Sequence, residues 1–177
     1  LLVDVYHQLG AVPFDPSGLG EAWLVGGGYK YLQLGEGNCF LRVPPHARDL
    51  RPVVTGWYAE SSGDEWAGAT YDPTSHYRAA WVFAFFAEHG LTPEVLRATS
   101  LRQTTFIAEQ LGVPGDRSQF GGFVAVPTPH AVELRDRLFE AGIHTDVRGD
   151  MLRLGPAPYV SDGQLGRAVD RLAAMMR

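Results

Sequence analysis

The sequence predicts an α/β protein in which the end of a mostly parallel sheet is followed by a smaller α+β domain. Three observations predict this fold class. The chain opens on an apolar run at residues 1–3, typical of a parallel strand that is buried on both faces. Two further short apolar strands follow within the first 43 residues. From residue 75 onward, apolar residues recur at helical spacing, with short strands between the helices.

The first part of the chain contains three predicted strands, at residues 1–6, 22–25 and 39–43. The second strand runs into three glycines at 26–28, and Gly35 and Gly37 mark a turn before the third, so these two strands form a strand-loop-strand hairpin. A connection containing Pro and Arg leads to Gly56-Trp57, and residues 61–73 are polar and predict a loop. We therefore expect residues 1–60 to form the C-terminal portion of a large domain and residues 61–177 to form a small α+β domain.

The second part of the chain predicts four helices and a small antiparallel sheet. The first helix spans residues 75–88, with Gly90 as its stop, and the second runs from Thr92, with Pro93 at its first position, to Gly112. A strand at 123–126, a helix at 131–141, two strands at 145–147 and 151–154, and a helix at 162–176 follow. Helices against a short sheet give an α+β satellite domain.

Composition excludes several classes of partner. The formal charge of -5 and the pI near 5.6 argue against a nucleic-acid surface, which needs clustered Lys and Arg. No apolar run has membrane-spanning length, no signal segment opens the chain, and the single Cys39 cannot form an internal disulfide. We therefore expect a cytoplasmic protein without a metal, a nucleic-acid partner or a membrane partner.

Lys30 is the only lysine among the 15 basic residues, the other fourteen being Arg. Only a lysine can supply a neutral amine for imine formation with a carbonyl, because Arg does not release its proton near neutral pH. The glycines before it allow the backbone to approach a ligand closely, and Tyr29 and Tyr31 flank it. The alternative is an ordinary surface lysine.

Asp4 and His7 lie at the end of the first strand, the carboxyl end where open α/β sheets bind ligands. An Asp there can pair with a protonated pyridine nitrogen, and a His can orient the Asp or a phosphate. The alternative is an Asp that caps a turn beside a His packed at the sheet edge.

Together, Asp4-x-x-His7 and, 23 residues later, Lys30 within Tyr29-Lys30-Tyr31-Leu32 resemble kynureninase, within the fold-type I pyridoxal-phosphate enzymes of the class V aminotransferase superfamily. The resemblance spans most of the chain and implies a fold-type I large domain, a small C-terminal domain, a homodimer and pyridoxal 5'-phosphate as cofactor. It implies that Lys30 forms the Schiff base, that Asp4 contacts the pyridine nitrogen, that His7 lies in the cofactor site and that Tyr29 binds the phosphate.

Three further positions are similar to the family pattern. Gly56-Trp57 matches a Gly-Trp pair whose indole reaches the phosphate, although core packing is an equal alternative for Trp57. Asp72, before Pro73, stands where the family has a small polar residue near the cofactor. Arg153, in a segment followed by Gly-Pro-Ala-Pro, matches the Arg that holds the substrate α-carboxylate, a task suited to a bidentate guanidinium. Pairing of Arg153 with Asp146 or Asp150 is the alternative.

Other positions depart from the pattern. Tyr58-Ala59-Glu60 stands where the family has an aromatic residue and Gly-His, and the loop at 35–39 has fewer glycines. The family's phosphate-gripping segment and ring-stacking aromatic precede the Asp and would lie upstream of Leu1. A piece of a longer enzyme is therefore favoured over a shortened relative.

These features predict hydrolysis of a kynurenine-like amino acid to an anthranilate-type product and alanine. Lys30 acts as the base, Asp4 holds the ring protonated, and Arg153 holds the α-carboxylate. Transamination or a lyase reaction of the class V type is one alternative. A non-catalytic domain that serves dimerisation or partner binding is the other.

Overall fold

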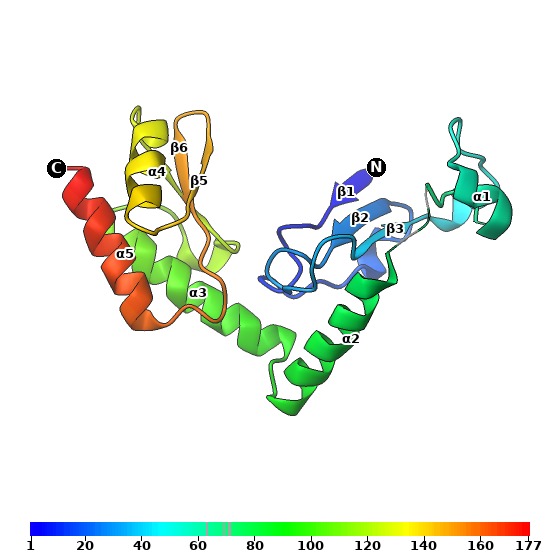
Figure 1. The fold of residues 1–177 in the computed structure, drawn as a ribbon, viewed down its shortest axis with the longest axis horizontal. Coiled ribbons are helices and arrows are strands. Elements are labelled where there is room, and N and C mark those ends of the chain that lie inside the picture. The colour runs from blue at the N-terminus through cyan, green and yellow to red at the C-terminus, as the bar shows by residue number, and fades with distance from the viewer. Residues whose placement is uncertain (63, 69, 71) are drawn as a thin grey trace. The chain divides into compact units, whose positions relative to one another are not determined.

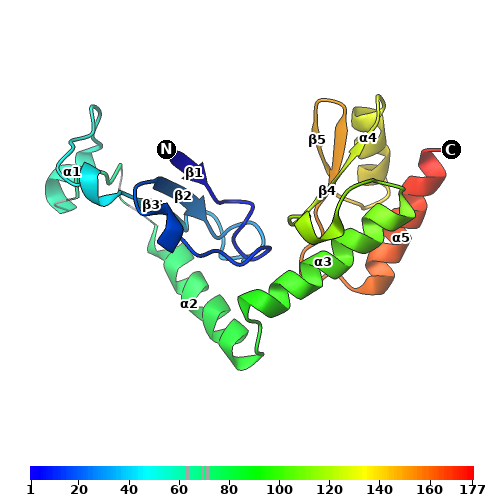
Figure 2. The ribbon, with the colours of Figure 1, turned by 180° about the vertical axis from the view of Figure 1, so that it is seen from behind.

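The computed structural model describes residues 1–62, 64–68, 70 and 72–177, and it divides into two compact units. Unit 1 comprises Leu1–Leu9 and Phe14–Gly90, and unit 2 comprises Gly10–Pro13 and Leu91–Arg177. Figure 1 shows the chain coloured from its N-terminus to its C-terminus, and Figure 2 shows it from behind. No helix among the described residues is long and apolar enough to cross a membrane.

Unit 1 is built on a three-stranded sheet with the order β1-β2-β3. Strand β1 (Leu2–Asp4) pairs in parallel with β2 (Trp23–Gly27), which pairs antiparallel with β3 (Cys39–Arg42). The predicted hairpin and the parallel first strand are confirmed. Burial of the first strand on both faces is not met within the described residues, because β1 forms the edge of this sheet and Leu2 is 62% exposed.

Two helices complete unit 1, together with the 3-10 turns Ser17–Leu19 and Pro45–Ala47. Helix α1 spans Trp57–Ser62, so the first two residues of the predicted loop at 61–73 are helical. Helix α2 (Pro73–Glu88) begins two residues before the predicted start, because Pro73 takes the first helical position and the Asp72 carboxylate accepts a hydrogen bond from the Thr74 amide.

Helix α2 is tied to the β2–β3 hairpin by two hydrogen bonds. Asn38 Nδ2 donates to the Ser75 carbonyl at 2.8 Å, and Arg78 Nε donates to the Gln33 carbonyl at 3.0 Å. These contacts group α2 with unit 1, so the compact units divide at residue 90. This division differs from the domain boundary expected after residue 60, which stays a prediction about the domains of the whole protein.

Unit 2 is an α+β arrangement of three helices against a sheet with the order β4-β6-β5 (Figure 1). Its helices are α3 (Pro93–Gln110), α4 (Ala131–Glu140) and α5 (Asp162–Met175), and Arg117–Gln119 forms a 3-10 turn. Its strands are β4 (Val124–Pro127), β5 (Asp146–Arg148) and β6 (Met151–Leu154), and both pairings are antiparallel. Every element predicted from residue 92 onward is confirmed to within two residues at each end.

The helices of unit 2 begin at strong local signals. Thr92 Oγ1 accepts from the Val95 amide at the start of α3, and Ser161 forms a reciprocal capping box with Gln164 at the start of α5. The core of the unit joins all three helices to one face of the sheet, and its fully buried members include Ile107, Leu138, Leu152 and Leu172. The opposite face of the sheet carries the alternate residues of each strand.

Candidate functional site: the carboxyl ends of β1 and β2

The carboxyl ends of β1 and β2 lie side by side. Asp4 is the register partner of Val25, and the Val5 amide donates to the Val25 carbonyl at 2.9 Å. Beyond this pair the two strands continue into Tyr6-His7 and into Gly26–Lys30. Because parallel strands end at a common edge, residues 23 apart in the sequence meet there.

Lys30 and His7 are in direct contact at this edge. Lys30 Nζ lies 2.7 Å from His7 Nε2, and it lies 5.6 Å from the centroid of the Tyr29 ring. Among the described residues, no carboxylate lies within ion-pairing distance of Lys30 Nζ. An ammonium group has no acceptor, so a protonated Lys30 requires His7 Nε2 to be the ring nitrogen without a proton. In that state the neutral imidazole accepts a hydrogen bond from the lysine.

Asp4 and Tyr29 lie around the same strand ends. Asp4 Oδ1 accepts a hydrogen bond from the Tyr6 amide at 2.8 Å, so Asp4 caps the turn that leads to His7. A carboxylate has more acceptor sites than one amide uses, and Asp4 is exposed. The Tyr29 ring packs against Tyr6, with ring centroids 5.6 Å apart. The structure thus gathers Lys30, His7 and Tyr29 into one cluster, and Asp4 lies three residues before His7 at the end of β1.

The three glycines before Tyr29 are required by packing inside unit 1. A Cβ atom on Gly27 would lie 2.7 Å from the Tyr6 ring and 2.9 Å from Cys39 Sγ, and one on Gly28 would overlap the Leu34 side chain. Packing within the chain is therefore sufficient to require these glycines, and close approach of a ligand to their backbone stays a prediction.

Tyr6 and Cys39 form a pair that sequence reasoning missed. Cys39 pairs with Gly27 across the β2–β3 ladder, and its thiol is hydrogen-bonded to the Tyr6 hydroxyl. This hydrogen bond, followed by burial, raises the pKa of Tyr6 to about 12. No local sequence signal joins these residues, because the contact depends on the register of two strands.

Trp57 and Asp72 occupy other parts of unit 1. Trp57 is 72% exposed at the start of α1 and makes an edge contact with Tyr58, so it is not a core residue. Asp72 caps α2, and its hydrogen bonds with Thr74 lower the pKa of the carboxyl. Among the described residues, neither side chain forms a hydrogen bond or an ion pair with Lys30.

Arg153 belongs to unit 2, where it lies on the central strand of the sheet. Its Nη2 forms an ion pair with Asp146 Oδ2, and its guanidinium carbon lies 5.1 Å from the centroid of the Phe123 ring. The hydrogen bond from Arg153 lowers the pKa of Asp146. The pairing with Asp146, one of two acidic partners considered from the sequence, is therefore present, while Asp150 takes no part in it.

The segment after Arg153 is fixed by a buried glutamine on α3. Gln103 is 1% exposed, and its Nε2 donates to the carbonyls of Ala157 and Val160 at 3.2 and 3.1 Å. These bonds hold the Gly-Pro-Ala-Pro segment against the helix. Sequence reasoning did not identify Gln103, since a polar residue within a helix gives no sign of its burial.

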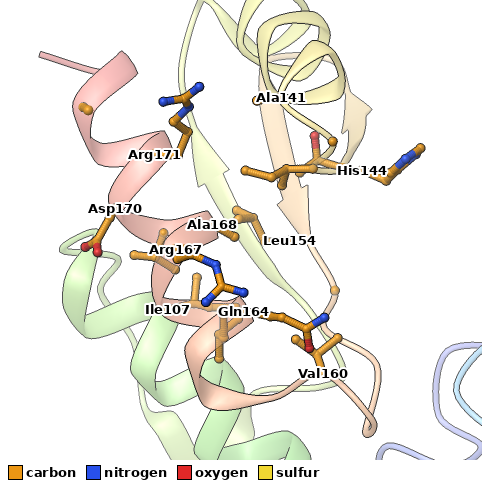
Figure 3. Close-up of a pocket in the computed structure, with 17 residues that line it drawn as sticks. Ile107, Ala141, His144, Leu154, Val160, Gln164, Arg167, Ala168, Asp170 and Arg171 are labelled. Carbon is orange, nitrogen blue, oxygen red and sulfur yellow. The ribbon is translucent and has the colours of Figure 1, made fainter.

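A groove of about 820 Å³ runs along α5 in unit 2 (Figure 3). Ile107, Leu154 and Val160 contribute apolar side chains, and Arg167 and Arg171 project from α5. Within the described part of the chain, its lining contains none of the residues predicted for the cofactor or substrate.

Comparison with known proteins finds similarity to kynureninases. Residues 92–172 match the family model of the kynureninase C-terminal domain. A kynureninase of Deinococcus radiodurans is 35% identical over 200 aligned positions, covering 98% of this chain and 48% of the relative. An uncharacterized aminotransferase of Bacillus subtilis is 28% identical over 189 positions, covering 98% of this chain and 51% of the relative. The chain thus spans about half the length of the curated relatives it matches.

Solved structures share the fold at lower identity. An alanine–glyoxylate aminotransferase from Nostoc sp. superposes with a TM-score of 0.76 at 18% identity, covering 100% of this chain and 54% of that one. A mutant of C-DES, with glycine covalently linked to its pyridoxal-phosphate cofactor, gives a TM-score of 0.73 at 17% identity, covering 93% of this chain and 49% of that one. The predicted fold class is confirmed. The chain is thus similar to a kynureninase along almost its whole length, matches the kynureninase C-terminal domain at residues 92–172, and has the fold of the fold-type I pyridoxal-phosphate enzymes.

Proposed function

We propose that this chain carries the cofactor lysine of an enzyme that hydrolyses kynurenine-like amino acids to an anthranilate-type product and alanine. Pyridoxal 5'-phosphate is the cofactor, and Lys30 is the proposed residue of covalent attachment. The contact between Lys30 Nζ and His7 Nε2, at the shared end of two parallel strands, carries the proposal. We propose further that the whole enzyme is a cytoplasmic homodimer.

The residues at the strand ends suit the cofactor chemically. Lys30 is the only side-chain amine in the chain, and a pyridoxal aldehyde needs one. Asp4 offers a carboxylate for a pyridinium nitrogen, and Tyr29 offers a hydroxyl for a phosphate. The bound cofactor supplies an electron sink that makes bonds to the substrate α- and β-carbons breakable.

The proposed roles of the chain's own groups follow from these contacts. Lys30 would hold the cofactor and, as a free amine, would serve as the base for the substrate α-proton, while His7 Nε2, 2.7 Å from Lys30 Nζ, would orient the amine through a hydrogen bond. Asp4 keeps the pyridine nitrogen protonated. Arg153 binds the substrate α-carboxylate, and Trp57 and Asp72 are proposed cofactor contacts. Water adds across the Cβ–Cγ bond of the side-chain ketone, giving a carboxylic acid and alanine.

The second candidate function is transamination or a lyase reaction on the same scaffold. The Bacillus subtilis relative is named as an aminotransferase, and the Nostoc neighbour is an alanine–glyoxylate aminotransferase. Ala59 and Glu60, which follow Tyr58, stand where the kynureninase pattern has Gly-His. Formation of an amino acid from a 2-oxo acid, without an aromatic amine product, would favour this candidate over the hydrolase.

Covalent trapping tests the cofactor site. The protein is incubated with pyridoxal phosphate, reduced with borohydride and mapped by peptide mass spectrometry. Since the chain contains one lysine, the adduct falls either on Lys30 or on an α-amino group. Lys30→Arg is the matched control, because it keeps the positive charge and cannot form an imine near neutral pH.

The expected result is an adduct on Lys30 that Lys30→Arg abolishes. Reduction of the full-length gene product in parallel identifies whether the chain alone retains the cofactor. Absence of the adduct from both proteins would overturn the enzymatic proposal and favour a non-catalytic interaction domain. Product analysis with L-kynurenine on the full-length enzyme then separates hydrolysis from transamination.

A further inference from the structure

Three charged side chains are linked to one another on one face of the sheet in unit 2. Asp146 of β5 lies directly opposite Arg153 of β6, and Arg148 lies two residues further along β5 on the same face. Arg153 Nη2 is bonded to Asp146 Oδ2, while Arg148 Nη1 donates to Asp146 Oδ1 at 2.9 Å. One carboxylate therefore joins two guanidinium groups.

This face of the sheet is the one that does not pack on the helices. Leu152 and Leu154 flank Arg153 in β6 and belong to the core, so Arg153 points to the opposite side. Phe123 stands just before β4, and its ring lies under the Arg153 guanidinium. The Arg153 side chain is 20% exposed, against 69% for Arg148. Arg153 is therefore the confined member of the pair.

We propose that Asp146 is a positioning residue that fixes the Arg153 guanidinium on the Phe123 ring, leaving its other N–H groups to receive the carboxylate of an amino-acid substrate. This inference rests on the proposed role of Arg153. A guanidinium has more N–H donors than one carboxylate oxygen can engage, and they are arranged in a rigid fork. Holding one nitrogen fixes the direction of the whole fork.

The charges of the three residues favour a monocarboxylate. Two guanidinium groups and one carboxylate leave a net charge of about +1 on this face, which one α-carboxylate neutralises. Without Asp146, Arg153 would lose its anchor and two cations would remain without a counter-charge. The alternative is that Asp146 occupies the N–H donors that the substrate needs, so that its removal would tighten carboxylate binding. The two alternatives therefore predict opposite changes in carboxylate affinity when Asp146 is removed.

The first experiment measures the order of the Arg153 side chain without any ligand. In the 177-residue chain labelled with ¹⁵N, the Nε–Hε signal of Arg153 is assigned by its loss in Arg153→Lys, and its heteronuclear NOE reports rigidity. We expect a rigid signal that becomes mobile in Asp146→Asn and is restored in part by Asp146→Glu. Asp150→Asn, on the turn of the same hairpin, is the matched control and leaves the signal unchanged.

The second experiment measures binding of a carboxylate by the full-length holoenzyme. The dissociation constant of L-alanine is read from the visible spectrum of the cofactor, and the KM and kcat are measured with L-kynurenine. Asp146→Asn is expected to weaken L-alanine binding and raise KM about tenfold, as for loss of a charge-assisted contact, with a smaller change in kcat. Asp150→Asn leaves all three values unchanged.

The outcomes separate this inference from the proposed function. If Arg153→Lys weakens L-alanine binding but Asp146→Asn leaves it unchanged or tightens it, the positioning role is overturned and the role of Arg153 stands. If Arg153→Lys has no effect on binding, both are overturned, even where Asp146 orders the side chain. Retention of the Lys30 adduct in every variant shows that the cofactor site itself is intact.

Discussion

Substitution of Gly27 by alanine tests whether close packing at the end of β2 sets the geometry of the Lys30 site. The added Cβ would lie 2.7 Å from Tyr6 Cε1, 2.9 Å from Cys39 Sγ and 3.0 Å from the Asn38 carbonyl oxygen. The side chains can shift, but the Asn38 carbonyl accepts the Gly28 amide at 2.9 Å and belongs to the hairpin ladder. Overpacking of this kind costs about 1–3 kcal/mol of folding free energy.

Tryptophan fluorescence reports this loss selectively. All four tryptophans, at positions 23, 57, 66 and 81, lie in unit 1. With a urea m-value of about 2 kcal/mol/M, the predicted loss of folding free energy lowers the urea concentration at the midpoint of the fluorescence transition by about 0.5–1.5 M. The matched control is Gly18→Ala, since a Cβ on Gly18 meets no atom within 4 Å. We expect the control to unfold within about 0.5 kcal/mol of the unsubstituted chain.

The same variant links packing to the site. Displacement of Tyr6 moves the segment that carries His7, so Gly27→Ala is expected to reduce the yield of the borohydride-trapped adduct on Lys30. An unchanged urea midpoint would refute the packing argument. A lowered midpoint with a full yield of adduct would refute the link between the glycine and the lysine.

Three further predictions concern the core, a helix cap and a titrating group. Leu138→Ala, at a fully buried position, is expected to destabilise unit 2 by about 2–5 kcal/mol by far-UV circular dichroism, while Val132→Ala on the exposed side of α4 changes stability by less than about 0.5 kcal/mol. Ser161→Ala removes the capping box of α5 and is expected to cost about 1 kcal/mol in the same assay, with equal stability counting against the cap. Alkaline absorbance titration, with Tyr6→Phe to assign the signal, should place the pKa of Tyr6 at about 12. Cys39→Ala removes the hydrogen bond and is expected to lower this pKa. Because the folded pKa lies above the ordinary value, the stability that this bond contributes is complete below about pH 10 and is lost as the pH rises toward 12.

The elements of unit 2 could be predicted because their signals are local. Thr92 and Ser161 cap their own helices, Pro93 takes a first helical position, and the apolar residues of α4 and α5 repeat at helical spacing. The sequence around Trp57 carries no such signal, and no helix is predicted where α1 begins. Short helices depend on surrounding structure more than on their own sequence.

The candidate site likewise has features that depend on residue identity alone and features that depend on the folded chain. The sequence alone determines the residues proposed for the chemistry, because a single lysine and its spacing from Asp4 and His7 depend only on residue identity. The resemblance to kynureninase implies that Lys30 and His7 share one cofactor site, and the parallel pairing of β1 and β2 brings the two side chains together.

Only the tertiary structure decided what holds these residues in place. The partner of Arg153 was Asp146 because strand register puts these residues opposite each other, and Asp150, only three residues away in sequence, lies on the turn. Likewise, Gly27 is required by Tyr6 and Cys39, which reach it from two other segments. Sequence order specifies chemical groups and local conformation, whereas distances between distant segments arise from pairing and packing of the folded chain.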